Sequence, residues 1–129
     1  MTKQTPPRPT DAELAILRVL WQRGPSTVRQ VHDLLNSTRP TVYTTILKLM
    51  QIMTDKGLVR RDESERAHVY QPALSQAETQ KRLVGDLLER AFGGSTMNLV
   101  MGALSAKKAS AEELAQIRQL LDDYEGGAK

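Results

Sequence analysis

The fold is decided by residues 39–72, which read RPTVYTTILKLMQIMTDKGLVRRDESERAHVYQP. Pro40 suits the first turn of a helix, because its fixed φ is helical and its missing N–H would have no partner there. Apolar residues at spacings of four, three and four then predict a buried stripe of Val42, Ile46, Leu49 and Met53. Gly57 is typical of a helix end. Two short extended runs follow, at residues 58–62 and 67–72, and predict a hairpin.

The residues before this stretch predict two more helices. Thr10 and Glu13 form a capping box, which starts a helix that leaves Glu13 on its outer face and ends at Gly24. Ser26 or Thr27 can cap a second, shorter helix. Its apolar stripe consists of Val28, Val31, Leu34 and Leu35. Three helices followed by a hairpin are the winged form of the helix-turn-helix, with the third helix as reader and the hairpin as wing.

The carboxy-terminal part, residues 74–129, predicts three further helices with apolar stripes. So small a segment buries too little of its own surface for much independent stability, and a second copy of the chain is the simplest partner. We therefore expect a mainly α fold, in which a disordered tail (1–9) precedes a winged helix-turn-helix domain (10–73) and an α-helical dimerisation domain (74–129). The candidate dimerisation residues are Leu87, Val100, Leu104, Leu114, Ile117 and Leu121.

The net charge of +3 is unevenly distributed along the chain. Residues 1–72 contain 11 Lys and Arg against 7 Asp and Glu, whereas residues 73–129 contain 7 against 8. This asymmetry suggests a polyanion-binding module joined to an assembly module, although chance scatter also explains a difference of this size. No apolar run approaches the ~18–20 residues of a membrane-spanning helix, and the amino terminus lacks a signal-peptide core. We expect a cytoplasmic protein with no membrane insertion.

The residue types that most enzymes and metal sites need are scarce. The chain has no cysteine and only two histidines, His32 and His68, which are far apart in sequence. Phosphate-binding glycine loops and the GxSxG nucleophile motif are missing from the sequence. Acidic pairs such as Glu112-Glu113 are expected at helix ends, where they cap the helix. We expect neither a metal site nor a cofactor, and no enzymatic activity.

The outer face of the third helix carries hydrogen-bonding side chains. Thr41, Thr44 and Lys48 share one side of the helix, and Tyr43 and Thr45 flank it. In a major groove, threonine hydroxyls and methyls can contact base edges, and lysine reaches a guanine or a phosphate. An ordinary solvated helix face is the alternative for these residues.

Arginines of the hairpin, together with Arg29 and Arg39 near the starts of the second and third helices, are candidates for phosphate contacts. Acidic residues 62, 63 and 65 offset much of the charge of the wing, so one or two position-fixing contacts are expected there. The principal candidate DNA-binding residues are Arg39, Thr41, Tyr43, Thr44, Thr45, Lys48, Arg60, Arg61 and Arg66. The alternative from another class is a winged-helix protein-interaction module without sequence-specific DNA binding.

The order of these motifs resembles the BlaI/MecI family of beta-lactamase and penicillinase repressors. The resemblance covers nearly all of residues 10–124 and is strongest in the winged half. The matching stretches are ELAIL at 13–17, GPSTVRQVH at 24–32, RPTVYTTIL at 39–47, KGLV at 56–59 and RAHVYQP at 66–72.

The resemblance implies a homodimeric transcriptional repressor that binds an inverted-repeat operator and takes part in an antibiotic response. In this family, a membrane metalloprotease receptor, or a protease downstream of it, triggers cleavage of the repressor in its dimerisation half. Carried across to this chain, the cleaved bond would fall near Gly102 and Ala103, where staphylococcal members have an Asn-Phe pair.

Overall fold

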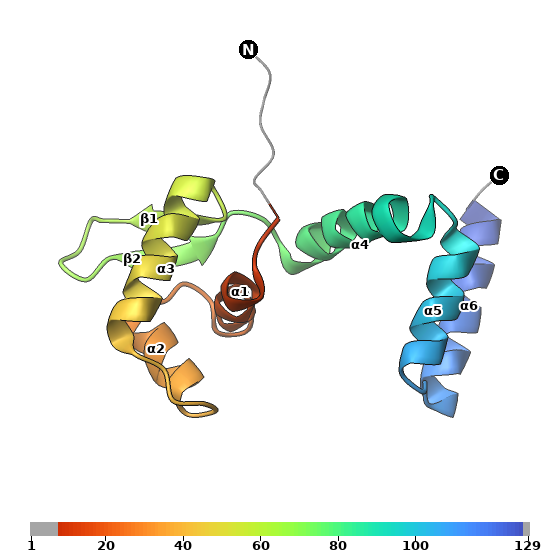
Figure 1. The fold of residues 1–129 in the computed structure, drawn as a ribbon, viewed down its shortest axis with the longest axis horizontal. Helices are drawn as coiled ribbons and strands as arrows, with labels where there is room; N and C mark the ends of the chain where they lie inside the picture. Colours follow the sequence, from red (N-terminus) through yellow and green to blue (C-terminus); the bar gives the residue numbers. More distant parts are fainter. Residues whose placement is uncertain (1–7, 128–129) are drawn as a thin grey trace, which may run out of the picture. The chain divides into compact units, whose positions relative to one another are not determined.

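The computed structural model describes residues 8–127, and most of the predicted tail (1–9) lies outside these described residues. Within them the chain forms six helices and one two-stranded sheet (Figure 1). It divides into two compact units, with the division between Leu83 and Val84. The first unit contains the winged helix, so the expected order of a winged helix followed by a helical segment is confirmed.

Helices α1 (Asp11–Arg23) and α2 (Val28–Asn36) both begin at complete capping boxes. Thr10 and Glu13 exchange hydrogen bonds at the start of α1, as predicted, and Thr27 and Gln30 do the same at the start of α2. Each box satisfies two backbone N–H groups that the first turn of a helix leaves without partners.

Helix α3 (Tyr43–Lys56) begins three residues later than its predicted start at Pro40. It ends at Gly57, whose φ of 82° is in the left-handed region, and Leu58 N–H donates to Met53 O. This is the hydrogen bond that closes a glycine-terminated helix.

The predicted stripe of α3 is wrong at its first position, because Val42 precedes the helix and is exposed. The buried residues of α3 are Ile46, Met50 and Met53, and Leu49 is half-buried. The prediction for α2 is wrong in the same way at Leu34, which is exposed. Both errors come from extending a helical period to a position that the neighbouring elements do not cover.

The wing is an antiparallel hairpin of β1 (Val59–Asp62) and β2 (Val69–Pro72), shorter at both starts than predicted. Two strands alone are marginal in water, and here the hairpin is supported by the helices. Tyr70 of β2 is buried and exchanges two backbone hydrogen bonds with Ser26, in the turn between α1 and α2. The wing is thus fixed to the helical core through Tyr70 of its second strand.

One core joins α1, α2, α3 and the wing. It also encloses Glu13, which the sequence placed on the outer face of α1 and which is only 1% exposed. Lys56 Nζ at the end of α3 lies 2.8 Å from Glu13 Oε2. The burial of this carboxylate is therefore balanced by an ion pair with a residue 43 positions away in sequence.

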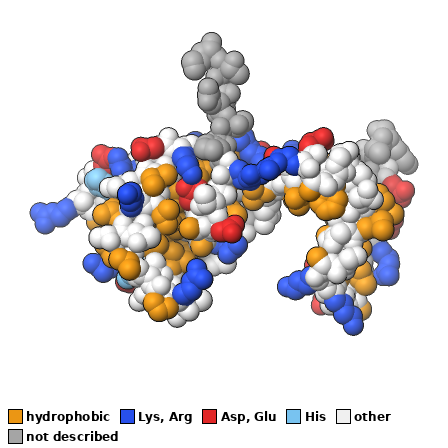
Figure 2. Space-filling model, in the orientation of Figure 1, with side chains coloured by type: hydrophobic (Ala, Val, Ile, Leu, Met, Phe, Trp, Pro, Cys, Tyr) orange, Lys and Arg blue, Asp and Glu red, His pale blue; other side chains and the backbone are white. Residues whose placement is uncertain are grey.

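In its described part, residues 84–127, the second unit has no core of its own. It contains the end of α4 (Gln76–Phe92), α5 (Thr96–Ala106) and α6 (Ala111–Gly127). None of the described residues 84–127 is buried, and Figure 2 shows apolar side chains open on the surface of this segment.

Candidate nucleic-acid interface

The outer face of α3 presents Thr44, Thr45 and Lys48 to solvent. Thr44 and Lys48 are one helical turn apart and lie opposite the buried Ile46 and Met50. With Thr41 just before the helix, these two residues form the surface that we call the reading face. The predicted separation of an apolar and a polar side of this helix is therefore present.

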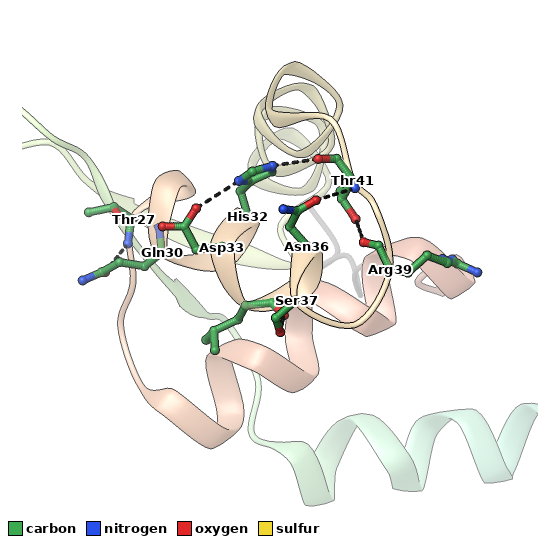
Figure 3. A network of polar contacts seen from close by, with 9 residues as sticks. Thr27, Gln30, His32, Asp33, Asn36, Ser37, Arg39 and Thr41 are labelled. Atoms are coloured by element: carbon green, nitrogen blue, oxygen red, sulfur yellow. Dashed lines mark hydrogen bonds and ion pairs between the residues drawn. The ribbon is translucent and has the colours of Figure 1, made fainter.

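Side chains of α2 hold the turn that leads into α3 (Figure 3). The imidazole Nε2 of His32 lies 2.7 Å from Thr41 O, and Asn36 Oδ1 accepts a hydrogen bond of 2.8 Å from Thr41 N. Both backbone groups of Thr41 are thus bound by residues one helical turn apart on α2. The Thr41 hydroxyl donates to Arg39 O, so its proton is engaged within the turn.

Tyr43, a predicted DNA contact, is half-buried in a second cluster at the start of α3. The guanidinium of Arg29 lies 4.5 Å from the centre of its ring, and the His32 imidazole meets the ring edge-on at 5.7 Å. A cation over an aromatic face at this distance is attracted by the ring quadrupole. The ring of Tyr43 therefore packs against α2 and helps to fix the orientation of α3.

The arginines of the wing differ in their surroundings. Arg60, Arg61 and Arg66 are all exposed, as is Arg39 before α3. Arg61 Nε donates to Glu63 Oε2 at 2.6 Å. The pKa of Arg61 is raised, mostly by a hydrogen bond with the Tyr70 side chain and next by the hydrogen bond with Glu63. Arg61 is therefore partly neutralised by its own wing.

The predicted dimerisation residues belong to a set of exposed and half-buried apolar side chains in the second unit, which we call its apolar surface. Leu87 of α4, Val100 and Leu104 of α5 and Leu121 of α6 are exposed, and Leu114 and Ile117 of α6 are half-buried. Met97, Met101, Leu120 and Tyr124 add to this surface. Exposed apolar area gathered in one segment is typical of an interaction site.

Gly102 and Ala103 lie within α5. A Cβ atom added at Gly102 would be 3.3 Å from Phe92 Cε1, so the Phe92 ring packs closely on the backbone here. The bond between Gly102 and Ala103 is thus held in helical geometry.

Among residues 8–127, no helix is both long enough and apolar enough to cross a lipid bilayer. The same residues contain no group of three His, Asp or Glu side chains that could hold a metal ion.

The sequence of this chain is similar to those of known repressors. The sequence profile of the penicillinase repressors matches residues 9–123. The chain belongs to the penicillinase repressor family. Transcriptional regulator BlaI of Mycobacterium tuberculosis is 32% identical over 118 residues, which are 91% of this chain and 85% of that protein. The penicillinase repressor of Bacillus licheniformis is 24% identical over 123 residues, 95% of this chain and 96% of that one.

A solved structure supports the fold of this penicillinase repressor family member. The solution structure of the DNA-binding domain of the repressor BlaI matches with a TM-score of 0.52 and 24% identity, and it covers 59% of this chain and 93% of that one. The similarity shows the winged-helix fold. The family is one of transcription repressors, which are not enzymes.

The sequence interpretation missed two residues that organise this interface, namely His32 and Asn36, which act on backbone atoms of the following turn. For Arg29 it predicts a phosphate contact, but not the packing of the guanidinium on the Tyr43 ring. The spacing of His32 and Asn36, four residues apart, is a signal that both lie on one side of α2. Their partner cannot be found from spacing alone, because it depends on how α3 packs on α2.

Proposed function

We propose that this protein is a sequence-specific DNA-binding transcriptional repressor that acts as a homodimer on an inverted-repeat operator. The observation that carries the proposal is the reading face, in which Thr44 and Lys48 are exposed opposite a buried apolar stripe on the third helix of a winged helix. Helices at this position in such folds enter the major groove and contact base edges. The named relatives are a transcriptional regulator and a penicillinase repressor, which supports the same function.

In this proposal, the arginines supply contacts that do not depend on sequence. Arg39, Arg60 and Arg66 are exposed and bind phosphates beside the reading face. Arg61 contributes less, because its ion pair with Glu63 must be broken or shared when it meets a phosphate. Tyr43 and Thr41 act mainly by shaping the start of α3, in keeping with the contacts that they make.

The apolar surface of the second unit is proposed to form the dimer. With no buried residue between 84 and 127, this unit gains a core only when its apolar side chains meet a partner. A second copy supplies an identical surface, and the resulting two-fold symmetry matches an inverted repeat. Leu87, Val100, Leu104, Leu114, Ile117 and Leu121 are the proposed contacts.

Release from DNA is proposed to occur by proteolysis between Gly102 and Ala103, triggered by a membrane metalloprotease receptor or a protease downstream of it. Proteases cut extended backbone, so α5 must unwind locally and Phe92 must leave Gly102 before cleavage. The protein itself is proposed to work in the cytoplasm, where the promoter DNA lies, and to have no catalytic activity or cofactor.

Thr44→Ala tests the reading face. We expect the variant to lose about 1 to 3 kcal/mol of binding free energy on the specific site, because a hydroxyl and a methyl that contact a base edge are removed. Binding to a shuffled duplex should change little. Fluorescence anisotropy against DNA from upstream of the gene and a shuffled duplex measures both.

Thr96→Ala removes an exposed threonine from α5 and is the matched control, with no change expected on either duplex. Arg61→Ala should weaken binding to both duplexes to a similar and small extent. If Thr44→Ala weakens binding to both duplexes equally, the reading face does not determine specificity.

A further inference from the structure

The residue that starts α3 is an unfavourable cap. Val42 is the N-cap and makes no side-chain hydrogen bond to the free N–H groups of the first turn. By contrast, α1, α2 and α5 are capped by Thr10, Thr27 and Ser95. A valine in place of such a residue lowers helix stability.

Val42 is also 64% exposed. Single exposed apolar residues are common on protein surfaces, and exposure alone does not indicate a function. Here the exposed valine stands where a polar residue would stabilise the helix. Residues that break a local rule without a visible structural benefit are expected at functional sites.

The exposed position of Val42 is fixed by the turn before it. His32 and Asn36 hold the carbonyl and the N–H of Thr41, the preceding residue (Figure 3). Val42 then has an extended backbone, with φ −85° and ψ 132°. A helical backbone at this position would turn the side chain toward the buried side of α3, near Ile46. The extended backbone turns it away instead.

The neighbours of Val42 indicate what it contacts. Thr41 precedes it, and Thr44 and Thr45 are exposed on the first turn that follows. In helix-turn-helix proteins, residues at the amino-terminal end of the reading helix contact base edges. Among the groups on the major-groove edges, the thymine C5-methyl is the apolar one. It is therefore the partner that an exposed valine at this place can bind.

We propose that Val42 is a specificity-determining residue that contacts a thymine C5-methyl in each half-site, and that His32 and Asn36 are the positioning residues that hold it outside the core. This inference rests on the proposed function. It adds to the reading face an apolar contact at its amino-terminal end.

The test replaces thymines of the operator by deoxyuridine, which lacks only the C5-methyl. Symmetric pairs in the two half-sites are exchanged one pair at a time, and binding is measured by fluorescence anisotropy. We expect one pair at which the wild-type protein loses about 16-fold in affinity, or about fourfold per half-site, since one buried methyl group is lost in each. The Val42→Ser variant should bind the unmodified thymine operator more weakly than the wild type by a similar factor. Its affinity should not fall further when that pair of thymines is replaced by deoxyuridine.

Val42→Ser adds a favourable cap, so its thermal midpoint should be equal to or above that of the wild type, which shows that the variant folds. If the wild type and Val42→Ser lose the same factor at every thymine pair, the inference is wrong. A retained preference for the operator over a shuffled duplex would then leave the proposed function intact. If the wild type prefers no promoter DNA over the shuffled duplex, the proposed function itself fails.

Asn36→Ala tests the positioning residues. Removing the acceptor for Thr41 N–H should reduce the discrimination between thymine and deoxyuridine at the Val42 pair, while affinity for the shuffled duplex stays unchanged. Ser37→Ala is the matched control, because Ser37 is the next residue and its hydroxyl binds only within α2, at Leu34 O. Unchanged discrimination in Asn36→Ala would contradict the positioning role.

Discussion

Leu121→Asp is expected to convert the proposed dimer into monomers and to lower operator affinity by about 100-fold or more. Leu121 lies on α6 and is 59% exposed, within the apolar surface that is proposed to meet the second copy. A carboxylate introduced there would be buried without a partner in the dimer, which is strongly unfavourable. The monomer then binds one half-site and loses the gain of simultaneous binding to two.

Sedimentation velocity measures the oligomeric state, and anisotropy on the operator measures affinity. Gln116→Asp adds the same charge at another exposed position of α6 and serves as the control, with the dimer expected to persist. A Leu121→Asp protein that still sediments as a dimer would show that α6 does not form the interface.

Glu13→Ala is expected to lower the free energy of unfolding by about 2 to 4 kcal/mol. The substitution removes the carboxylate that binds Lys56 at 2.8 Å and the half of the capping box that receives Thr10 N–H. Lys56 remains 30% exposed at its side chain and can reach water, which keeps the cost below that of a fully buried unpaired charge. Urea denaturation measures the change. Asp11→Ala, at an exposed carboxylate in the same helical turn, should change stability far less.

The same carboxylate predicts how stability depends on pH. Burial raises the pKa of Glu13, but the hydrogen bond from Lys56, that from Thr10 N–H and the Lys56 charge together lower it below its ordinary value. A lowered carboxyl pKa contributes stability that is fully present above the unfolded pKa of about 4.3 and is lost as pH falls through the folded value. The stability difference between wild type and Glu13→Gln should therefore shrink as pH decreases below about 4.3. A constant difference across this range would contradict the ion pair as its source.

Local signals in the sequence were sufficient for much of the winged half. The box at Thr10 and the glycine at 57 act on backbone groups within one or two turns and are where the sequence predicts them. Of the two candidate caps of α2, Ser26 and Thr27, the structure has Thr27. Glu13 shows the limit of such signals. Its spacing marked it correctly as a capping residue, but its burial depends on Lys56 of α3, which no local pattern can identify.

The reading face could be predicted from local sequence patterns, whereas the position of Val42 could not, because it depends on tertiary packing. Thr44 and Lys48 lie within regular helix, so their outward direction follows from the helical period. Val42 was predicted to be buried because that period was extended past the start of the helix. Its actual position is set by hydrogen bonds from His32 and Asn36 to Thr41, which require the packing of α2 against the turn.

The proposed repressor function depends on a preference of this protein for one DNA sequence over others. The most direct test is fluorescence anisotropy of the wild-type protein against DNA from upstream of its gene and a shuffled duplex, at two salt concentrations. We predict a steep loss of affinity with salt on both duplexes, typical of about 6 to 10 phosphate contacts, together with a preference of at least ~10³-fold for the upstream DNA. Equal binding to the shuffled duplex, to the upstream DNA and to other promoters would contradict the proposed repressor function and favour a winged-helix protein-interaction module.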